Sequence, residues 1–215
     1  MKLKQLLTAI KYRAEQVPDV DITDLVYDSR KAVPGCAFVC LRGANADGHK
    51  YAKTAAEKGA AVIIAEESVE APVPVILTEN TRLALAYLSA EFFGHPAEQM
   101  HVIGITGTKG KTTTAFMMRS MLEAAGHKTG VIGTIGVLYG DTLVQTDNTT
   151  PENYEVQKFM RQMVDAGCEY CVMEVSSIGL KDHRVAGFTF ELGLFTNFSE
   201  DHIGGAEHKD CLLYT

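Results

Sequence analysis

The segment HVIGITGTKGKTTT (residues 101–114) constrains the fold of this chain more than any other feature. Its apolar start, HVIGIT, is typical of a buried strand, and the following TTTAFMMRSMLEAAG has the apolar spacing of a helix. A glycine-rich turn joins the two. A strand, a glycine-rich turn and a helix in this order are the context that a phosphate-binding loop requires. The segment therefore predicts an α/β fold with an anion site at the end of a strand.

The residues of this turn match the chemistry of phosphate binding. Gly107 and Gly110 let the backbone curl so that successive N–H groups point at an anion, and the positive end of the next helix adds to that field. Lys111 supplies a point charge for the outer phosphates, and the Thr112 hydroxyl can bind the accompanying Mg²⁺. Ile105 stands where the strict G-x-x-x-x-G-K-[ST] pattern has its first glycine. The alternative is a glycine-rich turn that binds nothing.

Composition limits the class of protein. A chain of 215 residues with 46% hydrophobic and 22% charged residues is ordinary for a globular protein of one large or two small domains. The net charge of −7 argues against a nucleic-acid or anionic-membrane partner. The N-terminal MKLKQLLTAIKYR is basic and amphipathic but has neither a long apolar core nor a small-residue cleavage site. We therefore expect a first helix there and a cytoplasmic protein.

The cysteines are expected to pack in the core and not to act as a redox pair or a zinc site. There are five, an odd number, and with no export signal this indicates reduced thiols. Cys168 and Cys171 have the spacing of a redox pair or of half a zinc site. No second CxxC or HxxxH accompanies them, and they lead straight into the apolar run CVMEV. We expect both thiols to lie in the core.

The chain alternates predicted strands and helices, with a break at Gly94-His-Pro96 that is typical of a linker. This alternation predicts a mostly parallel sheet that binds ligands beyond the C-termini of its strands. We expect two domains, residues 1–98 and 99–215. The expected strands are 22–30, 37–43, 60–67, 73–79, 101–106, 128–136, 170–177 and 191–199, with a hairpin at 136–146. The expected helices, besides the first, are 49–60, 80–94, 112–126 and 151–167.

Further motifs follow the predicted strands. They are DNTTP (147–151), MEVSSIGL (173–180) and TNFSEDH (196–202), in addition to DSR (28–30) and GANADGH (43–49) in the first part. Together with GITGTKGKTTT these motifs resemble the Mur ligase family over essentially the whole chain. The combination of DSR, NTTPE and EVSS resembles most the MurE type, the ATP-dependent ligase that acts on UDP-MurNAc-L-Ala-D-Glu.

The resemblance implies a reaction and its partners. ATP would phosphorylate a substrate carboxylate, and the amine of a free amino acid, meso-diaminopimelate or L-lysine, would attack the acyl phosphate to form an amide in peptidoglycan synthesis. Such a reaction needs a metal and cationic groups around the transferred phosphoryl group. Residues 1–98 would be the UDP-MurNAc-binding domain and residues 99–215 an incomplete ATP-binding domain, with ATP and Mg²⁺ as cofactors and no predictable protein partner.

The resemblance also implies roles for single residues. Lys111, Glu174 and His202 would be catalytic, and Thr112, Glu174 and His202 would hold Mg²⁺. Without the loop, the residues alone favour an acid bound by a helix cap or water at Glu174, whereas with the loop they favour metal ligation. A lone histidine such as His202 is more often a surface or capping residue. The residues implied to bind the ATP phosphates are Gly107, Thr108, Lys109, Gly110, Lys111, Thr112 and Thr113.

A further set would bind the UDP-MurNAc-dipeptide. Without the resemblance these residues indicate a helix N-cap before a proline, a solvated arginine, a strand end and a glycine-rich surface turn. Two positions depart from the family: Ile178 replaces a frequent histidine, and Asp182 a neutral polar contact. The implied substrate residues are Ser29, Ala44, Asn45, Ala46, Asn148, Thr149, Thr150, Ser176, Asp182 and Arg184.

The chain ends where family members continue into a third domain that binds the amino acid. We therefore expect an N-terminal fragment that forms no amide by itself, with an exposed sheet edge. Alternatives within the superfamily are another Mur ligase or a folylpolyglutamate-type ligase. A non-catalytic nucleotide-binding module is a third possibility. A small P-loop kinase is disfavoured, because such kinases carry the loop near the N-terminus.

Overall fold

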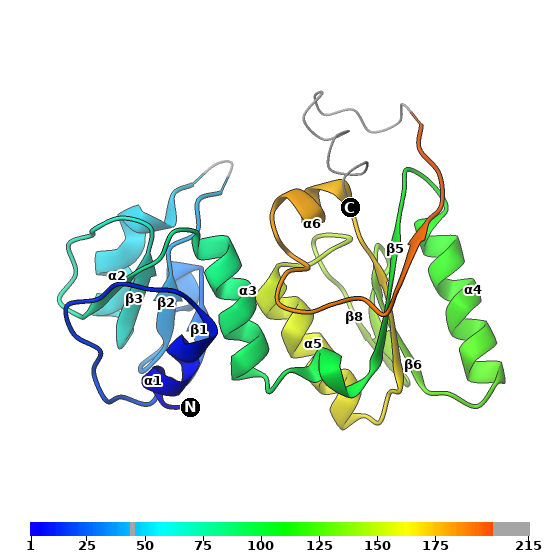
Figure 1. Ribbon diagram of the computed structural model, residues 1–215, viewed down its shortest axis with the longest axis horizontal. Helices are drawn as coiled ribbons and strands as arrows, with labels where there is room; N and C mark the ends of the chain where they lie inside the picture. The colour runs from blue at the N-terminus through cyan, green and yellow to red at the C-terminus, as the bar shows by residue number, and fades with distance from the viewer. Residues whose placement is uncertain (44–45, 200–215) are drawn as a thin grey trace. The chain divides into compact units, whose positions relative to one another are not determined.

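A computed structural model describes residues 1–43 and 46–199 of the protein (Figure 1). The chain divides into two compact units, the first spanning Met1–Phe92 and the second starting at Phe93. Both are α/β units with their own sheet, so the predicted fold class is confirmed. No helix in the described ranges is both long and apolar enough to cross a membrane.

The sheet of the first unit consists of four short parallel strands in chain order. Residues of β2 and β3 are all buried, as expected for parallel strands covered on both faces. Helix α2 (Ala52–Glu57) packs on one face, and α3 (Thr81–Phe92) lies on the other (Figure 1). The strands are β1 Leu25–Val26, β2 Ala37–Val39, β3 Val62–Ala65 and β4 Val75–Leu77.

Two predicted elements at the start of the chain are shorter than expected. The first helix is only α1 (Leu3–Leu6) with a 3₁₀ turn to Ala9, because the chain then runs extended and Arg13 exchanges two backbone hydrogen bonds with Leu77, both 2.8 Å. The strand predicted at 22–30 is reduced to β1. Its end turns into a 3₁₀ helix (Ser29–Lys31) because the Asp28 carboxylate accepts the N–H of Arg30 at 2.9 Å.

The second unit holds a six-stranded sheet in the order β10-β5-β9-β6-β7-β8. The first four strands of that order are parallel, and β6, β7 and β8 are antiparallel, so the predicted hairpin is confirmed. The strands are β5 His101–Thr106, β6 Thr129–Gly133, β7 Gly136–Tyr139, β8 Thr142–Val144, β9 Tyr170–Glu174 and β10 Leu192–Phe195. A 3₁₀ helix (Pro96–Gln99) precedes β5.

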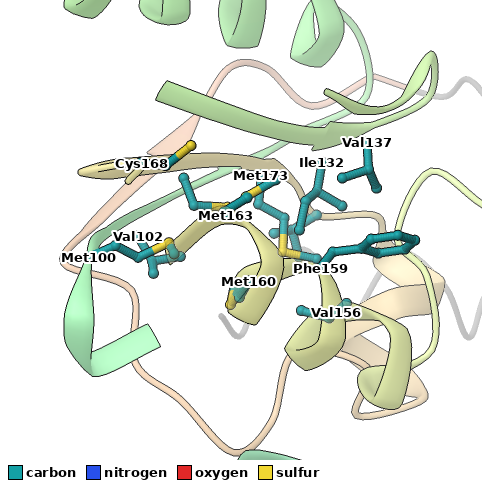
Figure 2. Packing of buried hydrophobic residues seen from close by; sticks show 12 residues of the cluster. Met100, Val102, Ile132, Val137, Val156, Phe159, Met160, Met163, Cys168 and Met173 are labelled. Atoms are coloured by element: carbon teal, nitrogen blue, oxygen red, sulfur yellow. The ribbon is translucent and has the colours of Figure 1, made fainter. Parts of the chain in front are cut away.

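Helices cover both faces of this sheet. On one face α5 (Asn153–Asp165) packs Val156, Phe159 and Met163 against the sheet, together with both cysteines of the CxxC pair (Figures 1 and 2). On the other face α4 (Lys111–Ala124) buries only Ala115. The cysteines are free thiols, and burial raises the pKa of the Cys171 thiol to about 12. Their predicted packing role is confirmed.

The end of β9 differs from its prediction. The strand ends at Glu174 and not at residue 177, because Ser176 begins a short helix, α6 (Ser177–Lys181), and its hydroxyl accepts the N–H of Gly179 at 3.0 Å. Helix α5 starts at Asn153, two residues later than expected, with Glu152 at its N-cap position. The alternative interpretation of the DNTTP motif as the cap itself is therefore wrong.

Candidate phosphate and metal site

The candidate site lies at the C-terminal ends of four neighbouring strands, β10, β5, β9 and β6. These strands are parallel, so their C-terminal ends meet at one edge of the sheet, where open α/β sheets bind ligands. The glycine-rich turn joins β5 to α4 at this edge. The register pairs Ile105 with Glu174, which brings the carboxylate next to the start of the turn.

The turn has the backbone of an anion-binding loop. Gly107 and Gly110 have φ of +131° and +85°, in the region that favours glycine, and Gly110 occupies the N-cap position of α4. The first N–H groups of α4 have no intrahelical acceptor and point toward the loop, as in other helix N-terminal anion sites. The Lys111 ammonium donates to the carbonyl oxygens of Gly107 (2.8 Å) and Thr108 (3.3 Å), which brings a positive charge over the loop.

Glu174 has the surroundings of a metal ligand. It is 0% exposed, and its oxygens accept from the hydroxyl of Thr112 (2.9 Å) and from the hydroxyl and N–H of Thr134 (both 3.1 Å). In the part of the chain that the structure describes, no lysine or arginine forms an ion pair with it. A buried carboxylate with only neutral partners is unusual, and a divalent cation would compensate its charge.

Gly133 provides the space for that carboxylate. A Cβ atom at this position would lie 2.2 Å from Glu174 Oε1, so only glycine lets the acid side chain lie against the end of β6. Glu174 and the Thr112 hydroxyl therefore form a donor set that suits Mg²⁺, as expected from the sequence. Of the three residues expected to bind the metal, the structure describes Thr112 and Glu174, and His202 lies outside the described residues.

Two of the expected substrate residues adjoin this site. The Thr149 hydroxyl is 3.0 Å from that of Thr134, so a chain of hydroxyls leads from the DNTTP turn to Glu174. Thr150 is fully buried: its hydroxyl donates to the Glu174 carbonyl at 3.1 Å and accepts the N–H of Ser176 at 2.9 Å. Thr150 and Ser176 thus fix the backbone around the site. Asn148 is exposed.

Arg184 and Asp182 form an ion pair with each other. The Arg184 side chain, 12% exposed, forms ion pairs with Glu152 (2.9 Å) and Asp182 (3.2 Å) and donates to the Thr150 carbonyl at 3.0 Å. A solvated surface arginine, the alternative considered from the sequence, is therefore wrong. The guanidinium ties the DNTTP turn to the segment after α6. Ile178, by contrast, is 46% exposed on α6.

The expected substrate residues of the first unit are only partly described. Ser29 lies in the 3₁₀ turn after β1, where its carbonyl accepts the Lys58 ammonium at 2.9 Å. Ala46 is exposed, and its carbonyl accepts the N–H of Gly43 at 2.8 Å. Ala44 and Asn45 lie outside the described residues.

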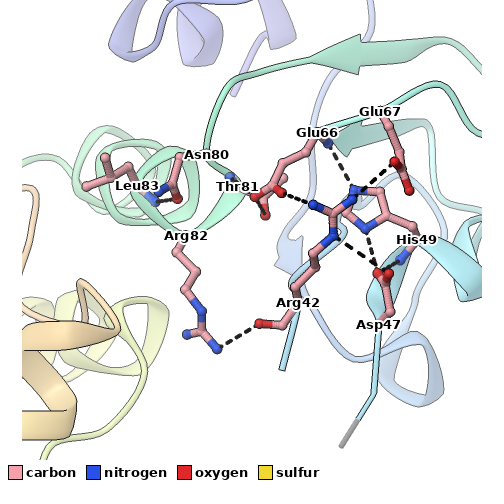
Figure 3. A network of polar contacts seen from close by, with 9 residues as sticks. All are labelled: Arg42, Asp47, His49, Glu66, Glu67, Asn80, Thr81, Arg82 and Leu83. Atoms are coloured by element: carbon pink, nitrogen blue, oxygen red, sulfur yellow. Dashed lines mark hydrogen bonds and ion pairs between the residues drawn. The ribbon is translucent and has the colours of Figure 1, made fainter. Parts of the chain in front are cut away.

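A second polar cluster, in the first unit, has the composition but not the chemistry of a metal site. Ligand atoms of Asp47, His49 and Glu67 lie within 4.8 Å of one another (Figure 3). The His49 Nε2 atom, however, accepts the N–H of Glu66 at 3.0 Å, and Nδ1 is 2.6 Å from Asp47 Oδ1, so both nitrogens are used. This hydrogen bond to His49 lowers the pKa of the Asp47 carboxyl.

One guanidinium already pairs with the acids of this cluster and with Glu66 beside them. Arg42 forms ion pairs with Asp47 (3.7 Å), Glu66 (2.9 Å) and Glu67 (3.2 Å). Glu66 also accepts the N–H and hydroxyl of Thr81 at 2.9 Å each, at the start of α3 (Figure 3). The cluster therefore stabilises the fold of the first unit.

The sequence analysis missed three residues of the site at the sheet edge: Thr134, Thr196 and Asn197. Thr134 binds Glu174, whereas the side chains of Thr196 and Asn197 bind the phosphate loop. Each follows the end of a buried or paired strand, which is the signal that could have identified them. The TNFSEDH motif was noted at such an end, but only its histidine received a role.

Known proteins are similar to this chain in sequence and in fold. A family model described as "Mur ligase middle domain" matches residues 105–214, and one described as "Mur ligase family, catalytic domain" matches residues 21–93. The UDP-N-acetylmuramoyl-L-alanyl-D-glutamate–2,6-diaminopimelate ligase of Bacillus licheniformis is 47% identical over 225 residues, which cover 100% of this chain and 46% of that protein. The chain thus spans about half the length of this relative.

Solved structures show the same fold. A structure of a UDP-N-acetylmuramoyl-L-alanyl-D-glutamate–2,6-diaminopimelate ligase superposes with a TM-score of 0.82 at 21% identity, covering 99% of this chain and 44% of the other. The MurF ligase of Thermotoga maritima in complex with ADP superposes with a TM-score of 0.62 at 22% identity, covering 88% of this chain and 41% of the other. At these identities the likeness concerns the fold alone.

Proposed function

The chain belongs to the Mur ligase family, and on this premise we propose that the protein is an ATP-dependent ligase of the MurE type in peptidoglycan synthesis. Its substrate is UDP-MurNAc-L-Ala-D-Glu, to which it adds a third amino acid through an amide bond. The name of the Bacillus licheniformis relative favours 2,6-diaminopimelate over L-lysine as that amino acid. The complete reaction is proposed for a protein of the length of this relative.

The observation that carries the proposal is the contact between Thr112 and Glu174. The contact joins the first turn of α4 to a buried carboxylate at the end of β9, the strand beside β5. Among the described residues, no lysine or arginine forms an ion pair with this carboxylate. This is the donor set that holds Mg²⁺ beside nucleotide phosphates. When bound, Mg·ATP supplies the phosphoryl group that activates the substrate carboxylate. The Thermotoga maritima ligase, which has the same fold, was solved in complex with ADP, and this supports nucleotide binding by a chain of this fold.

The roles of the loop residues follow from their positions. The N–H groups of the N-cap Gly110 and of the first residues of α4, up to Thr113, donate to the phosphate oxygens, and Lys111 moves its ammonium from the loop carbonyls to the phosphates. Thr112 and Glu174 would hold the cation, which would supply positive charge beside the transferred phosphoryl group. These groups act by positioning and by charge stabilisation, which are the main contributions of proteins to phosphoryl transfer.

The substrate residues are assigned on weaker geometric support. Thr149 lies one hydroxyl away from Glu174, at a place where it can bind a carboxylate close to the phosphates. Thr150, Ser176, Asp182 and Arg184 hold the turn that presents Thr149. Asn148 and, in the first unit, Ser29 and residues 44–46 complete the proposed muramoyl and uridine contacts. His202 is proposed as a further metal contact.

Calorimetric titration of the 215-residue chain with Mg·ATP tests the nucleotide site. We compare the unaltered chain with Glu174→Gln, which keeps the shape of the side chain but removes its charge and replaces one acceptor oxygen by an NH2 donor. We repeat both titrations with ADP in EDTA. We expect Glu174→Gln to weaken Mg·ATP binding by about 10-fold or more and to leave metal-free ADP binding nearly unchanged. Equal Mg·ATP affinities of the two chains would refute the metal role.

The same titration with UDP-MurNAc-L-Ala-D-Glu tests the substrate. Binding that is weakened by Ser29→Ala or Thr149→Ala supports the MurE type. Binding of Mg·ATP without any UDP-MurNAc-dipeptide binding would favour another Mur or folylpolyglutamate-type ligase. Amide formation is assayed in parallel with diaminopimelate and L-lysine, and we expect none from the 215-residue chain.

A further inference from the structure

The segment that follows β10 binds the phosphate loop from the side of the sheet. Because β10 pairs with β5 up to Phe195 and Thr106, the chain after it runs directly beside the loop. The Thr196 hydroxyl donates to the Lys109 carbonyl at 2.7 Å. The backbone carbonyl of Asn197 accepts the N–H of Thr108 at 2.9 Å. The loop is therefore bonded to this segment at two consecutive residues.

The Asn197 side chain binds both backbone groups of one loop residue. Its Oδ1 accepts the Lys109 N–H at 3.0 Å, and its Nδ2 donates to the Lys109 carbonyl at 2.9 Å. A backbone N–H can only donate and a carbonyl can only accept, so the orientation of the amide is determined by its partners. Among uncharged side chains of this length, only a carboxamide offers a donor and an acceptor in this arrangement.

These bonds decide which loop groups are available to an anion. The N–H groups of Thr108 and Lys109 donate to the backbone carbonyl and the side chain of Asn197, so neither is free to donate to an anion. The groups that remain available to bind an anion are therefore the first N–H groups of α4 and the Lys111 ammonium. Gly107 fits the same arrangement, because a Cβ there would lie 2.3 Å from Thr196 Oγ1.

We propose that Asn197 is the positioning residue of the phosphate loop: its carboxamide holds the Lys109 backbone so that the start of α4 is preorganised for nucleotide phosphates. The inference rests on the proposed nucleotide binding for its consequence, but the loop contact itself can be tested without nucleotide. Asn197 touches no substrate group and acts through the loop backbone.

The test compares Asn197→Ala with Phe198→Leu, a control at the next residue, whose ring is 44% exposed. Hydrogen exchange of loop peptides, measured without nucleotide, reads the contact directly. We expect faster exchange of the Thr108 and Lys109 amides in Asn197→Ala, with β5 and the rest of α4 unchanged. Loss of two hydrogen bonds that order the loop should weaken Mg·ATP binding about tenfold, whereas Phe198→Leu changes neither reading.

The outcomes separate this inference from the proposed function. Unchanged loop exchange in Asn197→Ala overturns the inference, whether or not Mg·ATP binds. Faster loop exchange with unchanged Mg·ATP affinity also overturns it, because the contact would then not prepare the site. Failure of the unaltered chain to bind Mg·ATP refutes the proposed function instead. If thermal melting shows that Asn197→Ala is unfolded, hydrogen exchange of the loop is measured on Asn197→Asp instead. This isosteric variant keeps the acceptor and loses the donor.

Discussion

Replacing Gly133 by alanine tests the arrangement around Glu174 most directly. The added Cβ would lie 2.2 Å from Oε1, 2.7 Å from Cδ and 2.9 Å from Cγ of that side chain. Atoms cannot approach so closely, so the carboxylate or the end of β6 must move. The carboxylate is 0% exposed and bonded to Thr112 and Thr134, so it has no free space to enter. The substitution therefore overpacks a buried polar contact.

The magnitude follows from the cost of overpacking. Inserting a methyl group into a packed interior typically costs about 1–3 kcal/mol of unfolding free energy. For a unit of this size such a loss lowers Tm by about 3–10 °C. The backbone conformation does not add to the cost, because Gly133 is not among the glycines with positive φ. Displacement of Glu174 from Thr112 should also weaken Mg·ATP binding.

Gly193→Ala is the matched control for this experiment. Gly193 also lies in a parallel strand, β10, but a Cβ there meets no atom within 4 Å, and we expect its unfolding free energy to change by about 1 kcal/mol or less. Differential scanning calorimetry of the three chains, with and without Mg·ATP, gives both readings. The reasoning would be refuted if Gly133→Ala had the same Tm as the unaltered chain, or if Gly193→Ala lowered Tm as much as Gly133→Ala.

Two further predictions concern charge and thiols. Arg184→Met removes the guanidinium that pairs with Glu152 and Asp182 and should cost about 2–3 kcal/mol in urea unfolding, against less than about 1 kcal/mol for Arg161→Met on the surface of α5. Similar losses in the two variants would contradict the structural role of Arg184. Burial raises the pKa of Cys171 to about 12, so at pH 8 an aromatic disulfide reagent should not modify this thiol in the folded chain. The folded state holds the thiol proton more tightly than the unfolded state, so this contribution to stability is complete below about pH 8.5 and declines as pH rises toward 12. If mass spectrometry found Cys171 modified at pH 8 in the folded chain, the prediction that this thiol is protected would be contradicted.

The fold was largely predictable because its signals are local. Buried runs such as HVIGIT and CVMEV, and the glycine turn between β5 and α4, are each specified by neighbouring residues. The early elements were overestimated for a physical reason. The amphipathic pattern up to Arg13 predicts a helix, but backbone pairing with Leu77, distant in sequence, replaces its second half. Tertiary contacts of this kind are absent from the local pattern.

The candidate site was predictable only as far as its motifs extend. The loop residues and Glu174 lie together as expected from their places at strand ends. The partners that determine their geometry come from other strands: Thr134 follows β6, and Asn197 follows β10, 88 residues from the Lys109 carbonyl that it binds. Asp182 lies two residues before Arg184, but nothing in the sequence indicates that Glu152 also pairs with it. Such pairings depend on strand order, which a single sequence does not specify.

The position of β10 links the growth of the sheet to the nucleotide. In the described part of the chain, β10 is one of the two edge strands of its sheet, with Leu192 and Phe195 about half exposed, and the residues after it bind the phosphate loop. A segment that pairs with its open side would restrain those residues and so reduce the entropy that phosphate binding must remove. By thermodynamic reciprocity, nucleotide would then strengthen the pairing by the same factor. With such a segment in place and the proposed nucleotide bound, edge and loop would form one cooperative unit, in which pairing at β10 and phosphate binding promote each other.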